Sequence, residues 1–326
     1  MSTATEMRYV NAVTQALRDS MEQDPAVIMM GEDVAHAGGS FKATRGLLDT
    51  FGPGRVIDTP ISESSITSAA VGMALSGLKP VVEIMFMDFI TLSMDALVNQ
   101  AAKARYMFGG QGSVPMVLRT PHGGGLSAGP QHSQCLEAWL AHIPGLKVVC
   151  PASPQDAYSL LRAAINDPDP VMFIEHKAMY ASKGQVDTAQ IGRIGEARTV
   201  RGGRDVTLIT YGSTVGVCLK VADQLSKEGV EVEVVDLRSI QPWDKTTVLE
   251  SLSRTHRAVV VHEAVQAFGV GAEIVATIAD EGFDELDAPV LRVAAPFMPA
   301  PFASSLEKGY TVTVDRVIEA VRKTLA

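Results

Sequence analysis

The stretch Arg55–Phe89, RVIDTPISESSITSAAVGMALSGLKPVVEIMFMDF, decides the fold class of this 326-residue chain. It begins with the short run VIDT and ends with the apolar run VVEIMF, and both are typical of buried strands. Residues 64–76 between them have the length of a helix, and their three alanines and one glycine allow another backbone to approach closely. A strand, a helix and a second strand with short connections predict a parallel sheet covered by helices.

The same alternation continues on both sides of this stretch. Helices are expected over 9–21, 88–107 and 156–166, and strands over 26–30 and at the runs MVLRT, KVVC and VMFIE. Ser153 or Asp156 can cap the last of these helices, and Pro154 suits its first turn. The first half of the chain therefore reads as one α/β domain.

A second domain follows a break in the pattern. Between residues 181 and 204 the chain has five glycines and no long apolar segment. A new alternation then runs from VTLITYG to a last helix that begins near Val314. We expect an α/β fold with two parallel-sheet domains, 1–185 and 204–326, joined by a linker over 186–203.

The charge balance and the cysteines exclude several classes of protein. The chain has 28 Lys and Arg against 37 Asp and Glu, a net charge of −9, which does not suit binding to nucleic acid or to anionic lipid. No apolar run approaches the roughly 18 residues that span a bilayer. Cys135, Cys150 and Cys218 form neither a metal-binding pattern nor a disulfide framework, so a reducing cytoplasm is the expected location.

Three segments contain residue types that packing alone does not require, and they are candidates for a functional site. They are a helix start with Glu63, the run VVEIMFMDF with Met85 and Phe89, and the loop RTPHGGGLSAGPQHSQC with His122 and His132. Each also has a purely structural interpretation, as a helix-dipole partner, as core residues and as bystander histidines. A glycine-rich loop after a strand is nevertheless where α/β sheets bind ligands. No Walker loop, GxSxG elbow or HExxH helix is found.

In their order and spacing these segments resemble the beta subunit of the thiamine-diphosphate-dependent decarboxylase component of 2-oxo acid dehydrogenase complexes. Further matching runs are GED at 31–33, NQAAKARYM at 99–107, HIPGLKVVCPASP at 142–154 and VVDLRSIQPWD at 234–244. The resemblance covers nearly the whole chain. It implies a pyrimidine-binding transketolase-like domain, a transketolase C-terminal-like domain, and an oxidoreductase that passes an acyl group to the lipoyl group of an acyltransferase.

The resemblance also implies roles for individual residues. Glu63 would hydrogen-bond the ring nitrogen of the cofactor's aminopyrimidine and so promote loss of the thiamine C2 proton. Phe89 would stack on the pyrimidine ring, and Met85 would pack beside it. His132, within QHSQ, would exchange protons during transfer to the lipoyl group. His122 has no counterpart and receives no role.

Metal ions and the partner chain follow from the same resemblance. Several members of the family hold a structural potassium ion, and the matching positions are Met116, Ala164, Asp167 and Asp169. The GDG motif that binds diphosphate and Mg²⁺ in thiamine enzymes is absent, and GED is no substitute. The resemblance therefore implies that an alpha subunit supplies the Mg²⁺ half of the site, in an α₂β₂ heterotetramer.

Alternatives stay open at this point. Pyruvate, branched-chain oxo acids and acetoin are all compatible substrates. A transketolase-like half enzyme acting on sugar phosphates would use the same domains but would need more basic residues in its pocket. A non-catalytic scaffold subunit is disfavoured because Glu63, Met85, Phe89 and His132 are all present.

Overall fold

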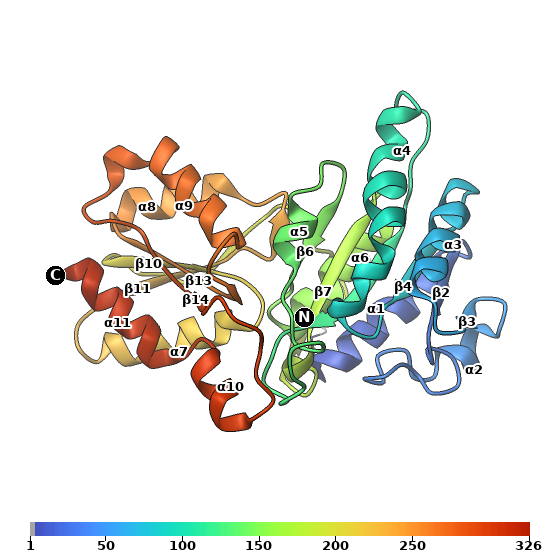
Figure 1. Ribbon diagram of the computed structural model, residues 1–326, viewed down its shortest axis with the longest axis horizontal. Coiled ribbons are helices and arrows are strands. Elements are labelled where there is room, and N and C mark those ends of the chain that lie inside the picture. Colours follow the sequence, from blue (N-terminus) through green and yellow to red (C-terminus); the bar gives the residue numbers. More distant parts are fainter. Residues whose placement is uncertain (1–3) are drawn as a thin grey trace. The chain divides into compact units, whose positions relative to one another are not determined.

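A computed structural model describes residues 4–326, which divide into two compact units (Figure 1). Unit 1 comprises residues 4–122 and Trp139–Ile194, and unit 2 comprises Gly123–Ala138 and Gly195–Ala326. The expected α/β class with two sheet domains is confirmed. The segment expected as a linker, 186–203, is divided between the units, and its residues Arg198–Arg201 form strand β9 of unit 2.

The strands of unit 1 form a parallel sheet in the order β6-β7-β5-β4-β2-β3. They are β2 (Val27–Gly31), β3 (Val56–Asp58), β4 (Lys79–Glu83), β5 (Val117–His122), β6 (Lys147–Val149) and β7 (Val171–His176). β2, β5 and β7 are buried along their whole length, as expected for strands covered on both faces. A separate antiparallel ribbon pairs β1 (Thr5–Arg8) with β8 (Lys183–Val186).

The helices of unit 1 bury apolar faces against this sheet. They are α1 (Tyr9–Gln23), α2 (Leu47–Phe51), α3 (Glu63–Leu75), α4 (Ala102–Met107) and α6 (Pro154–Asn166), with the short α5 (Glu137–Ala141) where the chain returns to unit 1. α1 and α6 pack against each other, and Leu17, Tyr158 and Phe173 lie in their common core. The expected cap of α6 is confirmed: Ser153 Oγ accepts the Asp156 N–H at 3.1 Å, and Pro154 occupies the first turn.

Removing this cap should weaken unit 1 measurably. In Ser153→Ala the Asp156 N–H loses its acceptor, and we expect the free energy of unfolding to fall by about 1 kcal/mol. The measurement is urea unfolding followed by circular dichroism. Ser68→Ala, on the exposed side of α3, is the control and should stay within about 0.5 kcal/mol of the parent. Equal midpoints for the two variants would show that the cap contributes nothing.

The segment expected as one helix over 88–107 changes its pitch twice. It comprises a 3₁₀ helix η1 (Met87–Ser93), a π-helical stretch η2 (Ala96–Ala101) and then α4. In its first turn the Phe89 N–H donates to Phe86 O at 3.0 Å, the i−3 bond of 3₁₀ geometry. Ser93, at the end of η1, bonds to α3 through Glu63. A tertiary contact therefore overrides the α-helical pattern of the sequence.

Unit 2 has a five-stranded sheet in the order β14-β13-β10-β11-β9, in which only β9 is antiparallel to its neighbour. Its strands are β9 (Arg198–Arg201), β10 (Val206–Thr210), β11 (Val232–Asp236), β13 (Ala258–Val265) and β14 (Leu291–Ala295), besides the short β12 (Ser239–Gln241). Figure 1 shows α7 (Thr214–Ser226) and α11 (Val314–Leu325) on one face, and α8 (Lys245–Thr255) and α9 (Val270–Glu281) on the other. The short α10 (Ser304–Tyr310) precedes α11.

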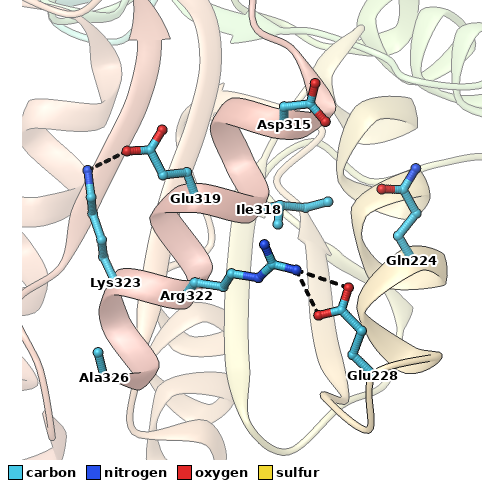
Figure 2. A pocket seen from close by; sticks show the side chains of 8 residues that line it. All are labelled: Gln224, Glu228, Asp315, Ile318, Glu319, Arg322, Lys323 and Ala326. Atoms are coloured by element: carbon cyan, nitrogen blue, oxygen red, sulfur yellow. Dashed lines mark hydrogen bonds and ion pairs between the residues drawn. The ribbon is translucent and has the colours of Figure 1, made fainter.

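One ion pair crosses the outer groove between α7 and α11, and a second lies along α11 (Figure 2). Arg322 Nη2 lies 2.8 Å and 3.0 Å from the two carboxylate oxygens of Glu228. Lys323 pairs with Glu319 one turn away at 2.8 Å. These charges compensate one another, which suits a solvated helix face. No helix within residues 4–326 is both long enough and apolar enough to cross a membrane.

Candidate functional site

Three parallel strands of unit 1 end side by side next to the predicted cofactor residues. Gly31, the last residue of β2, pairs with Asp58 of β3 on one side and with Glu83 of β4 on the other. The chain continues from these strand ends to Glu32, to Glu63 at the start of α3, and to the segment that follows β4. The carboxyl edge of a parallel sheet is the usual ligand-binding edge of such folds. Unit 1 thus gathers the predicted pyrimidine contacts at one edge.

Glu63 is buried at the first position of α3, where its side chain is 7% exposed. Its carbonyl oxygen accepts hydrogen bonds from Thr67 Oγ1 at 2.9 Å and from Ser93 Oγ at 3.0 Å. These two hydroxyls also lie 2.7 Å from each other. They tie the start of α3 to η1 and fix the backbone from which the Glu63 carboxyl projects.

Glu32 is a second buried carboxyl beside Glu63, and the sequence interpretation missed it. Burial raises the pKa of Glu32 above its ordinary value, and the neighbouring charge of Glu63 raises it further. Its Oε1 is buried and has no hydrogen-bond partner among the residues that the structure describes. A carboxyl pair with an unused buried oxygen fits a ligand that offers a hydrogen-bonding ring nitrogen, such as an aminopyrimidine. An acidic residue directly after a fully buried strand was the signal that could have found Glu32.

The apolar side chains Met85 and Phe89 lie beyond the end of β4 and are both half-buried. The ring of Phe89 packs edge-on against Phe86, with centroids 5.9 Å apart, and Phe86 packs in the same way against Phe41 at 5.8 Å. The Lys177 ammonium lies 5.6 Å from the centroid of the Phe86 ring. Phe89 is therefore supported by neighbouring rings, and the partly exposed surfaces of Met85 and Phe89 fit the faces of an aromatic ligand.

An ion cluster holds β4, β5 and β7 together below this edge of the sheet. Arg119, 1% exposed, donates to Glu83 at 2.7 Å and to both oxygens of Glu175 at 2.7 Å and 2.8 Å. The Tyr180 hydroxyl donates to Glu175 at 2.7 Å. Burial acts to lower the pKa of Arg119, but the charges of Glu175 and Glu83 raise it above its ordinary value. Glu83 lies two residues before Met85, so the cluster anchors the backbone that carries the predicted ring contact.

His122 does not belong to the glycine-rich loop, although the sequence placed it there. It ends β5 and pairs in register with His176, the last residue of β7. The two imidazoles lie edge-on with centroids 5.3 Å apart, and both side chains are buried. His176 Nδ1 accepts the Ala178 N–H at 3.2 Å. His122 is thus built into the carboxyl edge of the sheet.

His132 lies in unit 2, whereas Glu63, Met85 and Phe89 lie in unit 1. Its side chain is half-buried, and its backbone N–H donates to Gly129 O at 3.3 Å. The segment 123–138 that carries His132 clusters with the C-terminal half of the chain. The sequence interpretation had placed it in the first domain.

The positions matched to a potassium site lie in unit 1 and already bond to other protein groups. The carbonyl oxygens of Met116 and Ala164 each accept a backbone hydrogen bond. The Asp167 carboxylate accepts from Lys147 Nζ at 2.6 Å, and Asp169 pairs with Arg105 at 2.5 Å. A cation here would have to share these carboxylates with two basic side chains.

Family models match both halves of the chain. "Transketolase, pyrimidine binding domain" matches residues 5–183, and "Transketolase, C-terminal domain" matches residues 195–317. Among solved structures, a split-gene transketolase, described as an inactive beta4 tetramer, superposes with a TM-score of 0.81. It shares 20% sequence identity and covers 100% of this chain and 99% of its own, so it bears on the fold alone.

Curated relatives match the chain along nearly its whole length. The beta-2 subunit of the mitochondrial pyruvate dehydrogenase E1 component of Oryza sativa subsp. japonica is 45% identical over 98% of this chain and 86% of its own. The beta subunit of 2-oxoisovalerate dehydrogenase of Bacillus subtilis is 42% identical, over 97% and 98%. The beta subunit of the acetoin:2,6-dichlorophenolindophenol oxidoreductase of Cupriavidus necator is 44% identical to this chain, and the match covers 96% of each chain. The chain therefore belongs to the family of the beta subunits of 2-oxo acid and acetoin dehydrogenases, which combine transketolase pyrimidine-binding and C-terminal domains.

Proposed function

We propose that this chain forms the pyrimidine-binding half of a thiamine-diphosphate site in a dehydrogenase that cleaves a 2-oxo acid or acetoin. Membership of the family implies thiamine diphosphate as the cofactor, an alpha subunit and an acyltransferase component. The observation that carries the proposal is the buried Glu32–Glu63 pair at the carboxyl edge of unit 1, with an unused oxygen on Glu32. Met85 and Phe89, both half-buried, follow the neighbouring strand.

In this proposal each residue of the chain has a definite task. Bound thiamine diphosphate supplies the electron sink for breaking the bond next to the substrate carbonyl. Glu63 holds a proton in a hydrogen bond to the pyrimidine ring nitrogen, and the buried Glu32 beside it offers a second carboxyl to the ligand. Phe89 and Met85 cover the ring and exclude water. His132 moves a proton while the acyl group passes to the lipoyl group of the acyltransferase.

The proposal extends to the assembly and its metal ions. An alpha subunit would bind the diphosphate and Mg²⁺ in an α₂β₂ heterotetramer, because no GDG motif occurs in the 326 residues. Potassium would bind at Met116, Ala164, Asp167 and Asp169. We also propose the cytoplasm as the location, with the three cysteines unlinked by disulfides.

The dehydrogenase reading is favoured over a sugar-phosphate enzyme. Relatives of 42–45% identity are dehydrogenase or oxidoreductase subunits, whereas the transketolase resemblance is one of fold. The relatives act on pyruvate, 2-oxoisovalerate or acetoin according to their names. Similar identities to all three leave the choice among these substrates to experiment.

The purified chain alone should bind thiamine diphosphate weakly or not at all, because it has only the pyrimidine half of the site. Calorimetric titration of thiamine diphosphate with Mg²⁺ should show tight binding only after co-expression with the neighbouring alpha-subunit gene. The complex should then reduce an artificial electron acceptor with pyruvate, a branched-chain oxo acid or acetoin. Tight Mg²⁺-dependent binding by the isolated chain would contradict the divided site. A loaded complex that turns over none of the substrates would contradict the proposed function.

A further inference from the structure

Two carboxylates of unit 2 hold the glycine-rich part of the His132 loop by its backbone. Glu263 Oε1 accepts the Gly124 N–H at 2.6 Å. The two oxygens of Glu307 accept the Gly125 N–H at 2.8 Å and the Ser127 N–H at 3.0 Å. Hydrogen bonds from N–H groups to a carboxylate are about twice as strong as neutral ones. These partners lie about 140 and 180 residues along the chain from the loop, and Glu307 is only 5% exposed.

The elements behind these carboxylates are firmly placed. Glu263 lies in β13, in the parallel sheet of unit 2, and its Oε2 accepts the Ser213 hydroxyl at 2.5 Å just before α7 begins. Glu307 lies in α10 and is the one buried residue of that short helix. The loop is therefore fixed to secondary structure rather than to another loop.

The remainder of the segment passes close to another side chain and is fixed at one further point. Gly129 has a φ of +76°, and a Cβ there would lie 2.2 Å from the ring of Phe302. At the far end, the Tyr211 hydroxyl donates to Glu137 Oε1 at 2.8 Å. His132 therefore lies between anchors on both sides. All of these contacts lie within unit 2.

We propose that Glu263 and Glu307 are positioning residues that hold the loop in the conformation in which His132 acts. This inference rests on the proposed function, since His132 receives its role there. A loop with three successive glycines, Gly123–Gly125, has a large conformational entropy, and fixed anchors must oppose it. Misplacing a catalytic group by about 1 Å can lower the rate a hundredfold. Loosening the anchors should therefore slow the step in which His132 acts.

The chemistry of the two anchors predicts different sensitivities to glutamine. In Glu307→Gln one side-chain oxygen becomes an NH₂ group that faces a backbone N–H, and neither backbone donor can reverse its role. The Ser127 hydroxyl, 3.3 Å from Oε2, can turn, but it replaces neither of these two bonds. In Glu263→Gln the Ser213 hydroxyl can turn and accept from the new NH₂ group. We therefore expect Glu307→Gln to be the more damaging of the two.

The test compares these variants in the co-expressed α/β complex. The readout is the ratio of acyl transfer to a lipoylated domain over reduction of an artificial acceptor. In Glu307→Gln this ratio should fall about tenfold to hundredfold, as expected for the loss of one or two charge-assisted hydrogen bonds. Glu233→Gln is the matched control, because Glu233 is 4% exposed in the same unit but bonds Ser251 and Arg254. An equal fall in the control would overturn the proposal, since general weakening of unit 2 would then explain it.

Two further measurements separate positioning from a merely structural role. Amide hydrogen exchange of the loop 123–131 should be faster in Glu307→Gln than in the control. In a double-mutant cycle, Glu307→Gln should cost nothing further once His132→Ala is present, because both changes act through one group. An additional independent loss, or unchanged exchange, would overturn the anchoring. An unaltered ratio in His132→Ala would instead refute the proposed role of His132, so the two failures are distinguishable.

Discussion

Replacing Glu63 with glutamine is expected to lower turnover of the α/β complex by a factor of about 10² to 10⁴, the usual contribution of a positioned acid–base group. Glutamine keeps the size of the side chain and can hydrogen-bond a ring nitrogen, but it cannot deliver or accept the proton. The backbone at position 63 should be unchanged, because Thr67 and Ser93 hold its carbonyl oxygen. The measurement is the steady-state rate with an artificial electron acceptor at saturating cofactor.

Two controls make this result specific to the carboxyl. Glu22→Gln removes a carboxylate from the exposed side of α1 and should leave the rate unchanged. Glu32→Gln removes the buried carboxyl beside Glu63, together with its unused oxygen Oε1, and should give an intermediate loss. Cofactor binding to Glu63→Gln should weaken much less than its turnover, since the apolar ring contacts remain. Full activity of Glu63→Gln in the complex would remove Glu63 from the mechanism.

The fold was predictable because its signals are local. A run such as VVEIMF followed by a helical pattern needs only its neighbours to be interpreted, and short connections leave few topologies open. The cap at Ser153 was predictable for the same reason, since donor and acceptor are three residues apart. Glu63 could be singled out through the motif around it, which is also a local feature.

The partners of the site residues were not predictable in this way. Glu32 meets Glu63 only because β2 and β3 lie side by side, and Arg119 meets Glu175 across 56 residues. The segment 123–138 follows a strand of unit 1, yet Glu263 and Glu307 bind it within unit 2. A pattern read along the chain contains no information on such distant pairings. A single charge inside an apolar strand is nevertheless a signal that a buried partner must exist.

Arg119→Met should lower the free energy of unfolding by about 3–5 kcal/mol, the usual cost of removing one member of a buried ion cluster. Methionine fills similar volume, but Glu83 and Glu175 would remain without their cation, each 4% exposed or less. Burial already raises the pKa of Glu175 above its ordinary value, against the charge of Arg119, which lowers it. The measurement is the urea midpoint of the full chain, followed by circular dichroism.

Arg322→Met is the matched control, because the same substitution there breaks an ion pair of similar length on an exposed helix (Figure 2). Its cost should be under about 1 kcal/mol.

A triple variant with Arg119→Met, Glu83→Met and Glu175→Gln should recover much of the loss, since no charge of this cluster remains buried and Tyr180 keeps an acceptor. A triple variant that regains stability without regaining activity would mean that the cluster aligns the end of β4, which Met85 follows, more than it contributes to the free energy of unfolding. If Arg119→Met costs no more than Arg322→Met, the strands are held by their apolar packing and the cluster has neither role.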